Sequence, residues 1–410
     1  MSDPEFKPVE EQLAYLKKGA AEIIPEGDLK AKLESSLKTG RPLRAYLGVD
    51  PTAPDIHLGH TVVLRKLKHF QDLGHTAIFL IGDFSAMIGD PTGQSETRPP
   101  LTREQVDVNA KTYLAQVFKL LDPQKTEVRY NSEWLEKLSS YDVVRLCGHY
   151  RLARMLERED FRSRLANNQP ISVHELLYPL LTAYDAVVLK SDVEIGATEQ
   201  KFNLLVHRDI QREYGVPSEV ALTMPILVGL DGQRKMSKSL GNYIGITESP
   251  TDIFGKLMSI PDELMWTYYD LVTDRTPEEI AALKKEVASG AAHPMDVKMR
   301  LAQEVIAGFH SREAARKAAE NFQRVFRDRQ APAEAEVQRI SRGPAKKLVT
   351  LLAELKLAPS KTEAGRLIEQ GGVEIDGVRV ADPRKDIDLS HPAEFLLRAG
   401  KKKFLRVIVE

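Results

Sequence analysis

The chain has 410 residues and a formal net charge of −1, with 42% hydrophobic and 29% charged residues. This composition is typical of a globular protein with enough length for two or three domains. The balanced charge excludes a uniformly basic nucleic-acid coat, although not local basic patches. A single cysteine, Cys147, excludes a disulfide framework and a cysteine-ligated metal site within one chain, so we expect no protein-ligated metal. The N-terminus lacks the apolar core of a signal peptide, and no apolar run approaches membrane-spanning length, so we expect a cytoplasmic protein with no membrane partner.

The N-terminal part of the chain alternates β-rich runs with segments of helical periodicity. This alternation predicts a parallel, doubly wound α/β sheet, and such sheets bind nucleotides beyond the carboxyl ends of their strands. The segments with strand character cover residues 44–49, 76–82, 126–131, 186–196 and 219–230, and those with helical character cover residues 61–70, 103–121, 174–185 and 199–215.

The strand signal stops after about residue 247, and helical periodicity alone continues to about residue 328. The next stretch, Gln330 to Pro344, is small, polar and proline-bearing, which is typical of a linker. We therefore predict four consecutive parts: an α/β domain over residues 1–247, an α-helical domain over 248–329, a linker over 330–344 and a small α+β domain over 345–410.

The first motif is DPTAPDIHLGH, Asp50 to His60, which lies between an expected strand and an expected helix. Histidine and glycine are indifferent to poor helix formers, so stability does not require them at a helix start, and a ligand would explain them. A helix N-terminus favours phosphate, and Gly59 would let a flat ring lie against the backbone.

The second motif is RKMSKSLGN, Arg234 to Asn242, which follows a strand-like run. Lys235 and Lys238 lie three residues apart in a loop rich in serine and glycine, and they suit the oxygens of a polyphosphate. Alone, each histidine of the first motif is more simply a helix-start residue, and the lysines are ordinary surface residues. Together, at the ends of two strands in one α/β domain, the motifs indicate a nucleotide site.

With these two motifs the chain resembles the class I aminoacyl-tRNA synthetases, and more narrowly the bacterial tyrosyl-tRNA synthetases along essentially its whole length. The narrower resemblance is carried by YLGVDPTAPDIHLGH, GDFSAMIGDPTG, SETR, YPLLTAYD, GATEQKFNLL and the C-terminal tail. It implies a Rossmann-like catalytic domain, an anticodon-binding helical domain, a C-terminal tRNA-binding domain, and a homodimer that joins L-tyrosine to tRNA(Tyr) with ATP and its Mg²⁺.

The resemblance also assigns roles by position. The catalytic group acts on the ATP phosphates, with the arginine and the lysines closing from mobile loops; it comprises Thr52, His57, His60, Arg98, Lys235 and Lys238. The amino-acid pocket reads the phenol with Tyr46 and Asp185 and surrounds the ammonium group with Asp90, Tyr178, Thr182 and Gln200. The ATP site comprises Gly48, Asp50, His57, Gly59, His60, Gly196, Glu199 and Lys238. No general base is needed, because the attacking carboxylate is already ionised.

Three positions depart from the family pattern. Thr182 stands where relatives often have glutamine, which shortens an ammonium contact. Glu199 is one methylene longer than the expected ribose-binding aspartate, and Gln94 replaces a basic residue. None of the three touches the phenol pair, so they affect the strength of binding more than the choice of tyrosine.

The tail from Ala345 resembles the small RNA-binding module shared by a ribosomal protein and some pseudouridine synthases. Its basic residues cluster on or beside expected helices and near the chain end, a pattern that suits phosphates of structured RNA. The RNA-binding candidates are Lys346, Lys347, Lys361, Arg366, Lys401, Lys402 and Lys403.

Three functions remain open from the sequence. The first is the tyrosine–tRNA ligase just described. The second is another H-x-G-H nucleotidyl transferase that acts on a small acid, such as a pantothenate-ligase-like enzyme; the phenol pair and the RNA-binding tail count against it. The third is a non-catalytic RNA-binding paralogue, which the departures at Gln94, Thr182 and Glu199 keep open.

Overall fold

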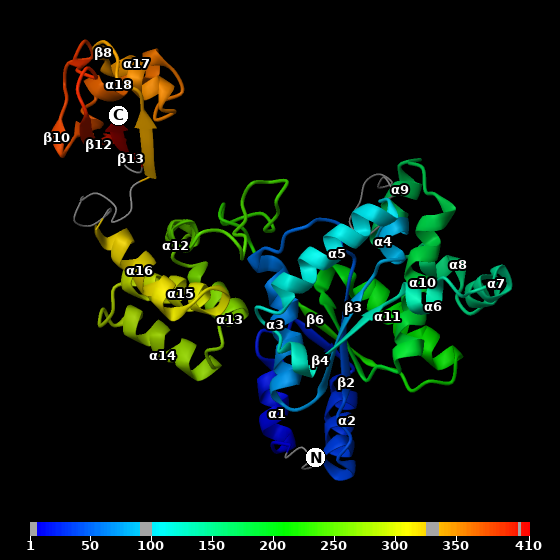
Figure 1. Ribbon diagram of the computed structural model, residues 1–410. Coiled ribbons are helices and arrows are strands. Elements are labelled where there is room, and N and C mark those ends of the chain that lie inside the picture. Colours follow the sequence, from blue (N-terminus) through cyan, green and yellow to red (C-terminus); the bar gives the residue numbers. More distant parts are fainter. Residues whose placement is uncertain (1–5, 91–100, 325–335, 401–402) are drawn as a thin grey trace. The chain divides into compact units, whose positions relative to one another are not determined.

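The computed structural model divides into two compact units, Met1–Ser311 and Arg312–Glu410. A six-stranded sheet forms the centre of the first unit (Figure 1). The structure describes residues 6–90, 101–324, 336–400 and 403–410. The strands of this sheet, in the spatial order β1-β6-β5-β2-β3-β4, are β1 (Glu22–Ile24), β6 (Val220–Met224), β5 (Val193–Ala197), β2 (Arg44–Val49), β3 (Thr76–Ile81) and β4 (Thr126–Tyr130). Neighbours from β6 to β4 are parallel, and β1 joins the edge antiparallel to β6. The predicted doubly wound α/β class is confirmed.

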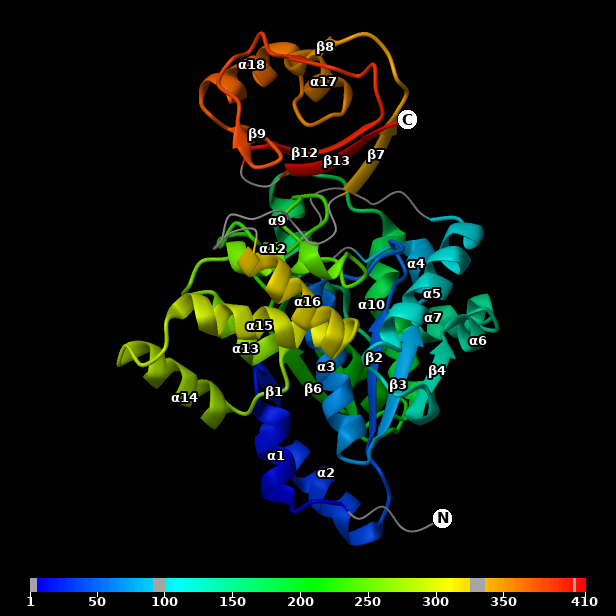
Figure 2. The same ribbon diagram turned by 60° about the vertical axis from the view of Figure 1, so that its left-hand side comes forward.

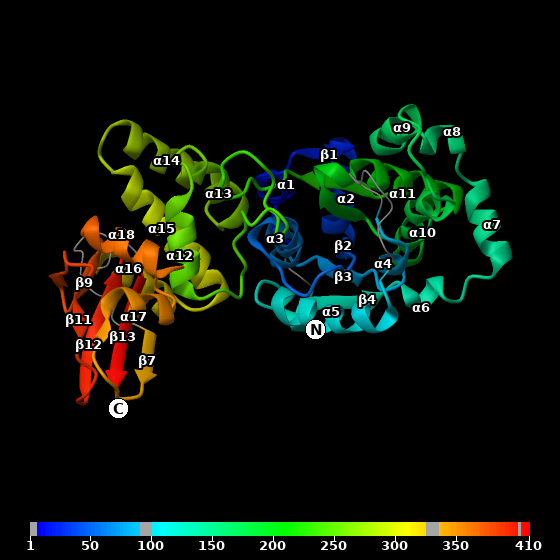
Figure 3. The ribbon, with the colours of Figure 1, turned by 90° about the horizontal axis from the view of Figure 1, so that it is seen from above.

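Helices cover both faces of this sheet. Seen from above, α3 (Leu58–Asp72) lies on one face, and α10 (Val173–Leu189) and α11 (Lys201–Glu213) lie on the other (Figure 3). Burial on both faces accounts for the nearly continuous apolar run in β3, as is usual for parallel strands. The other α-helices that precede β6 in the chain are α1 (Val9–Lys17), α2 (Glu26–Thr39), α4 (Ser85–Ile88), α5 (Arg103–Val117), α6 (Ser132–Leu135), α7 (Ser140–Gly148), α8 (Leu152–Met155) and α9 (Glu159–Ala166).

The prediction of a strand over residues 186–196 is wrong at its beginning. Residues 186–189 are the last turn of α10, whose C-cap Lys190 has a positive φ of 48°, and β5 begins only at Val193. The apolar residues of this turn fit either structure by pattern, and packing of α10 on α11 decides for the helix. The antiparallel strand β1 was not predicted, because its three residues carry no periodic signal.

The expected helical segment after residue 247 contains α12 (Pro250–Ser259), α13 (Met265–Val272), α14 (Pro277–Ala288) and α15 (Pro294–Phe309). These helices belong to the same compact unit as the sheet rather than to a unit of their own. The reason is packing of α13 against α3, together with hydrogen bonds such as Lys18 Nζ to the Thr273 carbonyl, 2.7 Å. The boundary between compact units falls at Ser311, near the end of the segment.

The second unit begins with α16 (Arg312–Phe322). Its five-stranded sheet has the order β10-β9-β12-β13-β7, and α17 (Leu348–Glu354) and α18 (Lys361–Glu369) lie against one face of it (Figure 2). The strands are β7 (Glu336–Ile340), β9 (Val373–Ile375), β10 (Val378–Arg379), β12 (Ala393–Ala399) and β13 (Lys403–Val409), and a separate pair joins β8 (Lys346–Lys347) to β11 (Asp386–Ile387).

The linker predicted over residues 330–344 needs a correction. Residues 336–340 form β7, which pairs in parallel with β13, and Ile340 packs on the core of this unit. Val337 and Ile340 are three residues apart, so this stretch shows no strand alternation, and it forms an edge strand because β13 offers a partner. Residues 330–335 lie outside the described residues.

Candidate active site

A cavity with a volume of about 460 Å³ opens at the carboxyl end of the six-stranded sheet. Among the site residues expected from the sequence, it is lined by Tyr46, Gly48, Asp50, Thr52, His57, Gly59, His60, Asp90, Tyr178, Thr182, Asp185, Glu199, Gln200 and Lys235. Gly196 and Lys238 are not among its lining residues. Arg98 and Gln94 lie outside the described residues.

The two histidines of the first motif begin α3. His57 is the N-cap: its Nδ1 accepts from the Gly59 N–H at 3.1 Å, while His60 Nδ1 accepts from the His57 N–H at 3.2 Å. The two rings lie against each other, with centroids 3.8 Å apart. Because both Nδ1 atoms are acceptors, each neutral ring carries its proton on Nε2. Both side chains therefore remain hydrogen-bond donors toward a ligand.

Burial keeps these rings neutral. Burial, assisted by the positive charge of Lys238, lowers the pKa of His57 to about 4. For His60, burial and then the neighbouring ring and Lys238 lower the pKa to about 3. Gly59 is required here for a reason that the sequence did not show, since a Cβ atom at this position would lie 2.9 Å from the His57 ring.

Backbone pairing brings the second motif to the first. The Leu58 N–H donates to the Ile244 carbonyl at 2.9 Å, and His57 forms a β-bridge with Gly245. On the other side, the Met236 N–H donates to the Leu227 carbonyl at 2.8 Å, which holds the lysine loop at the end of β6. The two signature motifs thus form one edge of the same cavity.

The two lysines of the second motif are held by acceptors at this edge. Lys235 Nζ pairs with the Glu199 carboxylate at 3.2 Å, and both side chains are about half exposed. Lys238 Nζ donates to the Asp55 carbonyl at 2.5 Å, with the Asp55 carboxylate 4.0 Å away. Exposed ion pairs of this kind contribute little to stability, so an incoming polyphosphate can compete for both lysines.

At the opposite end of the cavity, Asp185 is 3% exposed and accepts two hydrogen bonds from the protein. Trp134 Nε1 donates to one oxygen at 2.7 Å, and Asn131 Nδ2 donates to the other at 3.2 Å. Burial raises the pKa of Asp185 well above its ordinary value, and the two donors act in the opposite direction. Asp185 is therefore a rigidly held acceptor in the cavity wall.

Asp50 links this end to the first motif. Its carboxylate accepts from the Tyr178 hydroxyl at 2.9 Å and from the Ser85 hydroxyl at 2.7 Å, and Asn131 Nδ2 donates to Ser85 at 3.0 Å. Burial, followed by the charges of Asp50 and Asp90, raises the pKa of Tyr178 well above its ordinary value, so the phenol stays neutral. This hydrogen-bonded series fixes the side chains between the two ends of the cavity.

The remaining expected residues lie between these ends. Asp90 is 3.9 Å from the guanidinium of Arg158, which also donates to Asn203. Gln200 accepts from the Ala197 N–H at 2.9 Å and so begins the turn after β5. A Cβ atom at Gly196 would lie 3.2 Å from that Gln200 oxygen, so Gly196 acts by making room.

Several polar residues that line the cavity were not among the sequence candidates: Ser85, Tyr113, Asn131, Glu194, Asn203 and His207. Glu194 lies in the middle of β5, and His207 lies on α11 among the buried residues Leu204 and Ile210. The available signal was a charged residue inside a buried strand and a histidine on the apolar face of a helix. Either feature alone is common in a protein core, and only the fold places the two side chains in contact.

In the second unit, a hollow on the surface brings together three of the expected RNA-binding residues, Lys347, Lys361 and Arg366, with Arg384. Lys346 instead pairs with Glu354 at 2.6 Å, and Lys403 donates to the Leu357 carbonyl at 3.1 Å, in the segment that follows α17. Lys401 and Lys402 lie outside the described residues.

Family models match the chain in two places. Residues 38–327 match the model for tRNA synthetases class I (W and Y), and residues 346–391 match the S4 domain. The chain is thus a member of the class I tRNA synthetases. The tyrosine–tRNA ligase of Moorella thermoacetica is 54% identical over 97% of this chain and 96% of that protein, and the one from Aquifex aeolicus is 53% identical over 97% and 99%. Within the class, the chain belongs to the tyrosine–tRNA ligase family.

The solved structures agree with this assignment. The tyrosyl-tRNA synthetase of Archaeoglobus fulgidus, crystallised with L-tyrosine, is 26% identical, with a TM-score of 0.61 over 76% of this chain and 100% of that one. The family expected from the sequence motifs is confirmed. In the described part of the chain, no helix combines the length and the apolar character needed to cross a bilayer.

Proposed function

We propose that this chain activates L-tyrosine with ATP, giving tyrosyl-adenylate and pyrophosphate, and then transfers the tyrosyl group to the 3′ end of tRNA(Tyr). The observation that supports this most directly is one cavity lined by residues of both signature motifs and by Tyr46 and Asp185. The first group suits a nucleotide triphosphate, and the second suits a phenol.

In the activation step, a carboxylate oxygen of tyrosine bonds to the α-phosphorus of ATP, and the bond from that phosphorus to the pyrophosphate oxygen breaks. The negative charge moves onto the pyrophosphate. The Nε2–H groups of His57 and His60 donate hydrogen bonds to phosphate oxygens at the start of α3, where the helix dipole also favours an anion. Lys235 and Lys238 leave Glu199 and Asp55 and neutralise the leaving group. Thr52 and Arg98 complete this group. Catalysis is then positioning plus charge stabilisation.

The substrate contacts follow the same division of the cavity. Tyr46 and Asp185 read the phenolic hydroxyl, while the ammonium group lies among the side chains Asp90, Tyr178, Thr182 and Gln200. Adenosine lies against Gly59 with Glu199 at the ribose, and Gly48, Asp50 and Gly196 complete the ATP site. Mg²⁺ enters bound to ATP, as part of the substrate.

The second unit supplies tRNA contacts through Lys347, Lys361 and Arg366, which lie together on its surface. Lys346 and the lysines at positions 401–403 of the sequence add further contacts to the tRNA phosphates. The α-helical segment after residue 247 contributes the anticodon contacts. We further propose that the chain works in the cytoplasm as a homodimer that associates through the α/β domain.

The decisive experiment is tyrosine-dependent exchange of labelled pyrophosphate into ATP, followed by charging of tRNA(Tyr). We expect exchange with tyrosine and almost none with phenylalanine, because a buried phenol-reading pair is left unsatisfied by phenylalanine; tyrosyl-tRNA synthetase is the standard example of this effect. Exchange with a different small acid would indicate another nucleotidyl transferase. Absence of any exchange, with tRNA binding intact, would indicate a non-catalytic paralogue.

A further inference from the structure

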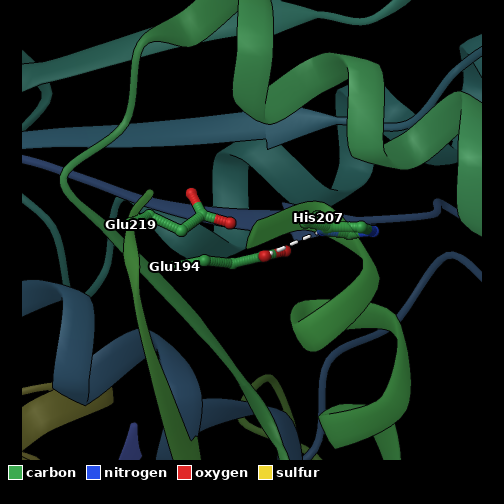
Figure 4. A group of neighbouring side chains, drawn as sticks. All are labelled: Glu194, His207 and Glu219. Atoms are coloured by element: carbon green, nitrogen blue, oxygen red, sulfur yellow. Dashed lines mark hydrogen bonds and ion pairs between the residues drawn. The ribbon is translucent and has the colours of Figure 1, made fainter. Parts of the chain in front are cut away.

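Three buried side chains that the reaction does not use directly lie close together (Figure 4), and two of them, Glu194 and His207, line the cavity. Glu194, His207 and Glu219 are 5%, 4% and 0% exposed. Glu194 is the direct register partner of Tyr46 across the β2–β5 pair, so the two side chains lie on the same face of the sheet. His207 Nδ1 lies 2.8 Å from Glu194 Oε2 and 3.4 Å from the Tyr46 hydroxyl.

The hydrogen bonds around His207 determine where its proton lies. The Thr182 hydroxyl donates to the Tyr178 carbonyl at 2.9 Å, so its only proton is used. His207 Nε2 lies 3.0 Å from the same Thr182 oxygen and must therefore donate to it. Nδ1 of the neutral ring is then an acceptor, and the hydrogen bond at 2.8 Å takes its proton from Glu194.

The charges agree with this direction. Burial raises the pKa of Glu194 to about 7, and burial raises the pKa of Glu219 well above its ordinary value, while burial lowers the pKa of His207 to about 4. A carboxyl oxygen of Glu219 lies within 4.8 Å of Glu194, and Glu219 accepts from the Ser191 hydroxyl. Two buried carboxyl groups in contact must share a proton or a cation. Because His207 Nδ1 lies within direct hydrogen-bond distance of Glu194, a shared proton explains this cluster more simply than a bound cation.

We propose that His207, acting through Glu194, is a positioning residue that holds the Tyr46 hydroxyl at the place where the phenol of the substrate is read, and so helps to determine specificity. The proposal rests on the proposed function, since it takes tyrosine as the substrate. The Tyr46 hydroxyl lies beside Glu194, its register partner across the β2–β5 pair, and 3.4 Å from His207 Nδ1. His207 takes the Glu194 proton away from Tyr46, so Glu194 offers Tyr46 an acceptor of fixed direction. Without that acceptor direction, the Tyr46 hydroxyl is free to turn from the substrate.

Two conservative substitutions test the roles of the two imidazole nitrogens, Nδ1 and Nε2, separately. In His207→Asn, the side-chain oxygen can take the place of Nδ1 and accept from Glu194. In His207→Gln, the amide can reach Thr182 in place of Nε2 but offers Glu194 nothing. His207→Ala removes both. Ile210→Ala, buried on the same helix and outside the cavity lining, is the matched control for lost packing in α11.

The full-length variants are compared by pyrophosphate exchange with tyrosine and with phenylalanine. We expect His207→Ala to raise the KM for tyrosine about tenfold or more, the size of one buried hydrogen bond, with little change in kcat or in the KM for ATP, and to reduce the preference for tyrosine by a similar factor. His207→Asn should restore most of this preference, and His207→Gln should not. Ile210→Ala should lower Tm and leave the preference unchanged.

The proposal is overturned if folded His207→Ala keeps its preference for tyrosine within about twofold, a change too small for a lost hydrogen bond. Equal rescue by asparagine and glutamine would overturn it as well, because the effect would not pass through Glu194. So would one equivalent of a transition metal in the purified protein, lost on substitution of Glu219 by glutamine. Calorimetric binding of tyrosine gives the same comparison without turnover, so an inactive wild-type protein would contradict the proposed function and leave this test intact.

Discussion

Replacement of Asp185 by asparagine gives the sharpest test of the amino-acid pocket. Asp185 offers one oxygen to Trp134 Nε1 and the other to Asn131 Nδ2. Asparagine has only one acceptor oxygen, so its amino group must face one of these two donors whichever way the amide is turned. A buried donor left without an acceptor costs about 1–3 kcal/mol, and this cost falls on every substrate alike.

Tyrosine suffers an additional loss that phenylalanine does not share. In the proposed site the phenol donates to Asp185, and a buried hydroxyl that loses its acceptor costs about 1–3 kcal/mol. At 1.4 kcal/mol for each factor of ten, the ratio of kcat/KM for tyrosine to that for phenylalanine should fall about 5- to 150-fold. Pyrophosphate exchange with both amino acids, at saturating ATP, measures this ratio.

The matched control is Glu175→Gln. Glu175 lies on the same helix α10, is also 3% exposed, and pairs with Arg164 at 2.6 Å, but it does not line the cavity. Replacing this carboxylate by a neutral amide should lower Tm clearly, because the buried charge of Arg164 loses its counter-charge, while the ratio of kcat/KM for the two amino acids stays unchanged. If Asp185→Asn reduces activity with tyrosine and phenylalanine equally, Asp185 serves only the structure and the reasoning is refuted.

Three further predictions test other parts of the molecule. Lys238→Ala should lower the rate of adenylate formation in rapid-quench experiments far more than it weakens tyrosine binding, because the lysine meets the pyrophosphate charge only as it develops; a loss confined to binding would contradict its role. A chain that ends near residue 330 should still form tyrosyl-adenylate, since the cavity lies within Met1–Ser311, and should keep the dimeric state proposed above. Charging of tRNA should collapse and residual binding should depend less steeply on salt; undiminished charging would reject the RNA-binding role of the second unit. Burial raises the pKa of Glu194 from an ordinary 4.5 to about 7, so its protonation stabilises the folded protein fully below about pH 4.5, and this contribution is lost as the pH rises through about 7. The Tm of Glu194→Gln should therefore rise relative to that of the wild type between pH 5 and 8. A difference in Tm that does not depend on pH would show that Glu194 is not protonated in the folded state.

The periodicity of the sequence predicted most of the central fold. Strands β2, β3 and β4 and helices α3 and α5 lie close to their expected residues, because turn residues separate the β-rich runs from the segments of helical periodicity. The failures have specific causes. Residues 186–189 fit a strand or a helix equally well by pattern, and β7 becomes a strand only because β13 lies beside it. In both cases a distant partner, which the local pattern does not encode, decides the structure.

The candidate site divides in the same way. The motif residues were recognisable because they occur in runs, such as DPTAPDIHLGH, whose composition no ordinary helix or strand requires. Glu194 and His207 were not recognisable, because each is a single polar residue inside an apolar element. Thr182 was read as a shortened contact, but the structure places His207 Nε2 3.0 Å from its hydroxyl, so the space beyond Thr182 is filled by a polar group.

The strand order explains why these residues meet. The chain leaves β2 for β3 and β4 on one side of the sheet and returns with β5 on the other side of β2, so the connections diverge between β2 and β5. Ligands of open α/β sheets bind at such a point of divergence. Asp50 follows β2 there, and Gly82, at the end of β3, has no room for a side chain, because a Cβ atom would lie 2.1 Å from the Asp50 carboxylate. The glycine after β3 thus lets Asp50 join Ser85 and Tyr178, and the turn after β5 supplies Glu199 and Gln200 across from them. Residues far apart in sequence become one site because three neighbouring parallel strands end at the same edge.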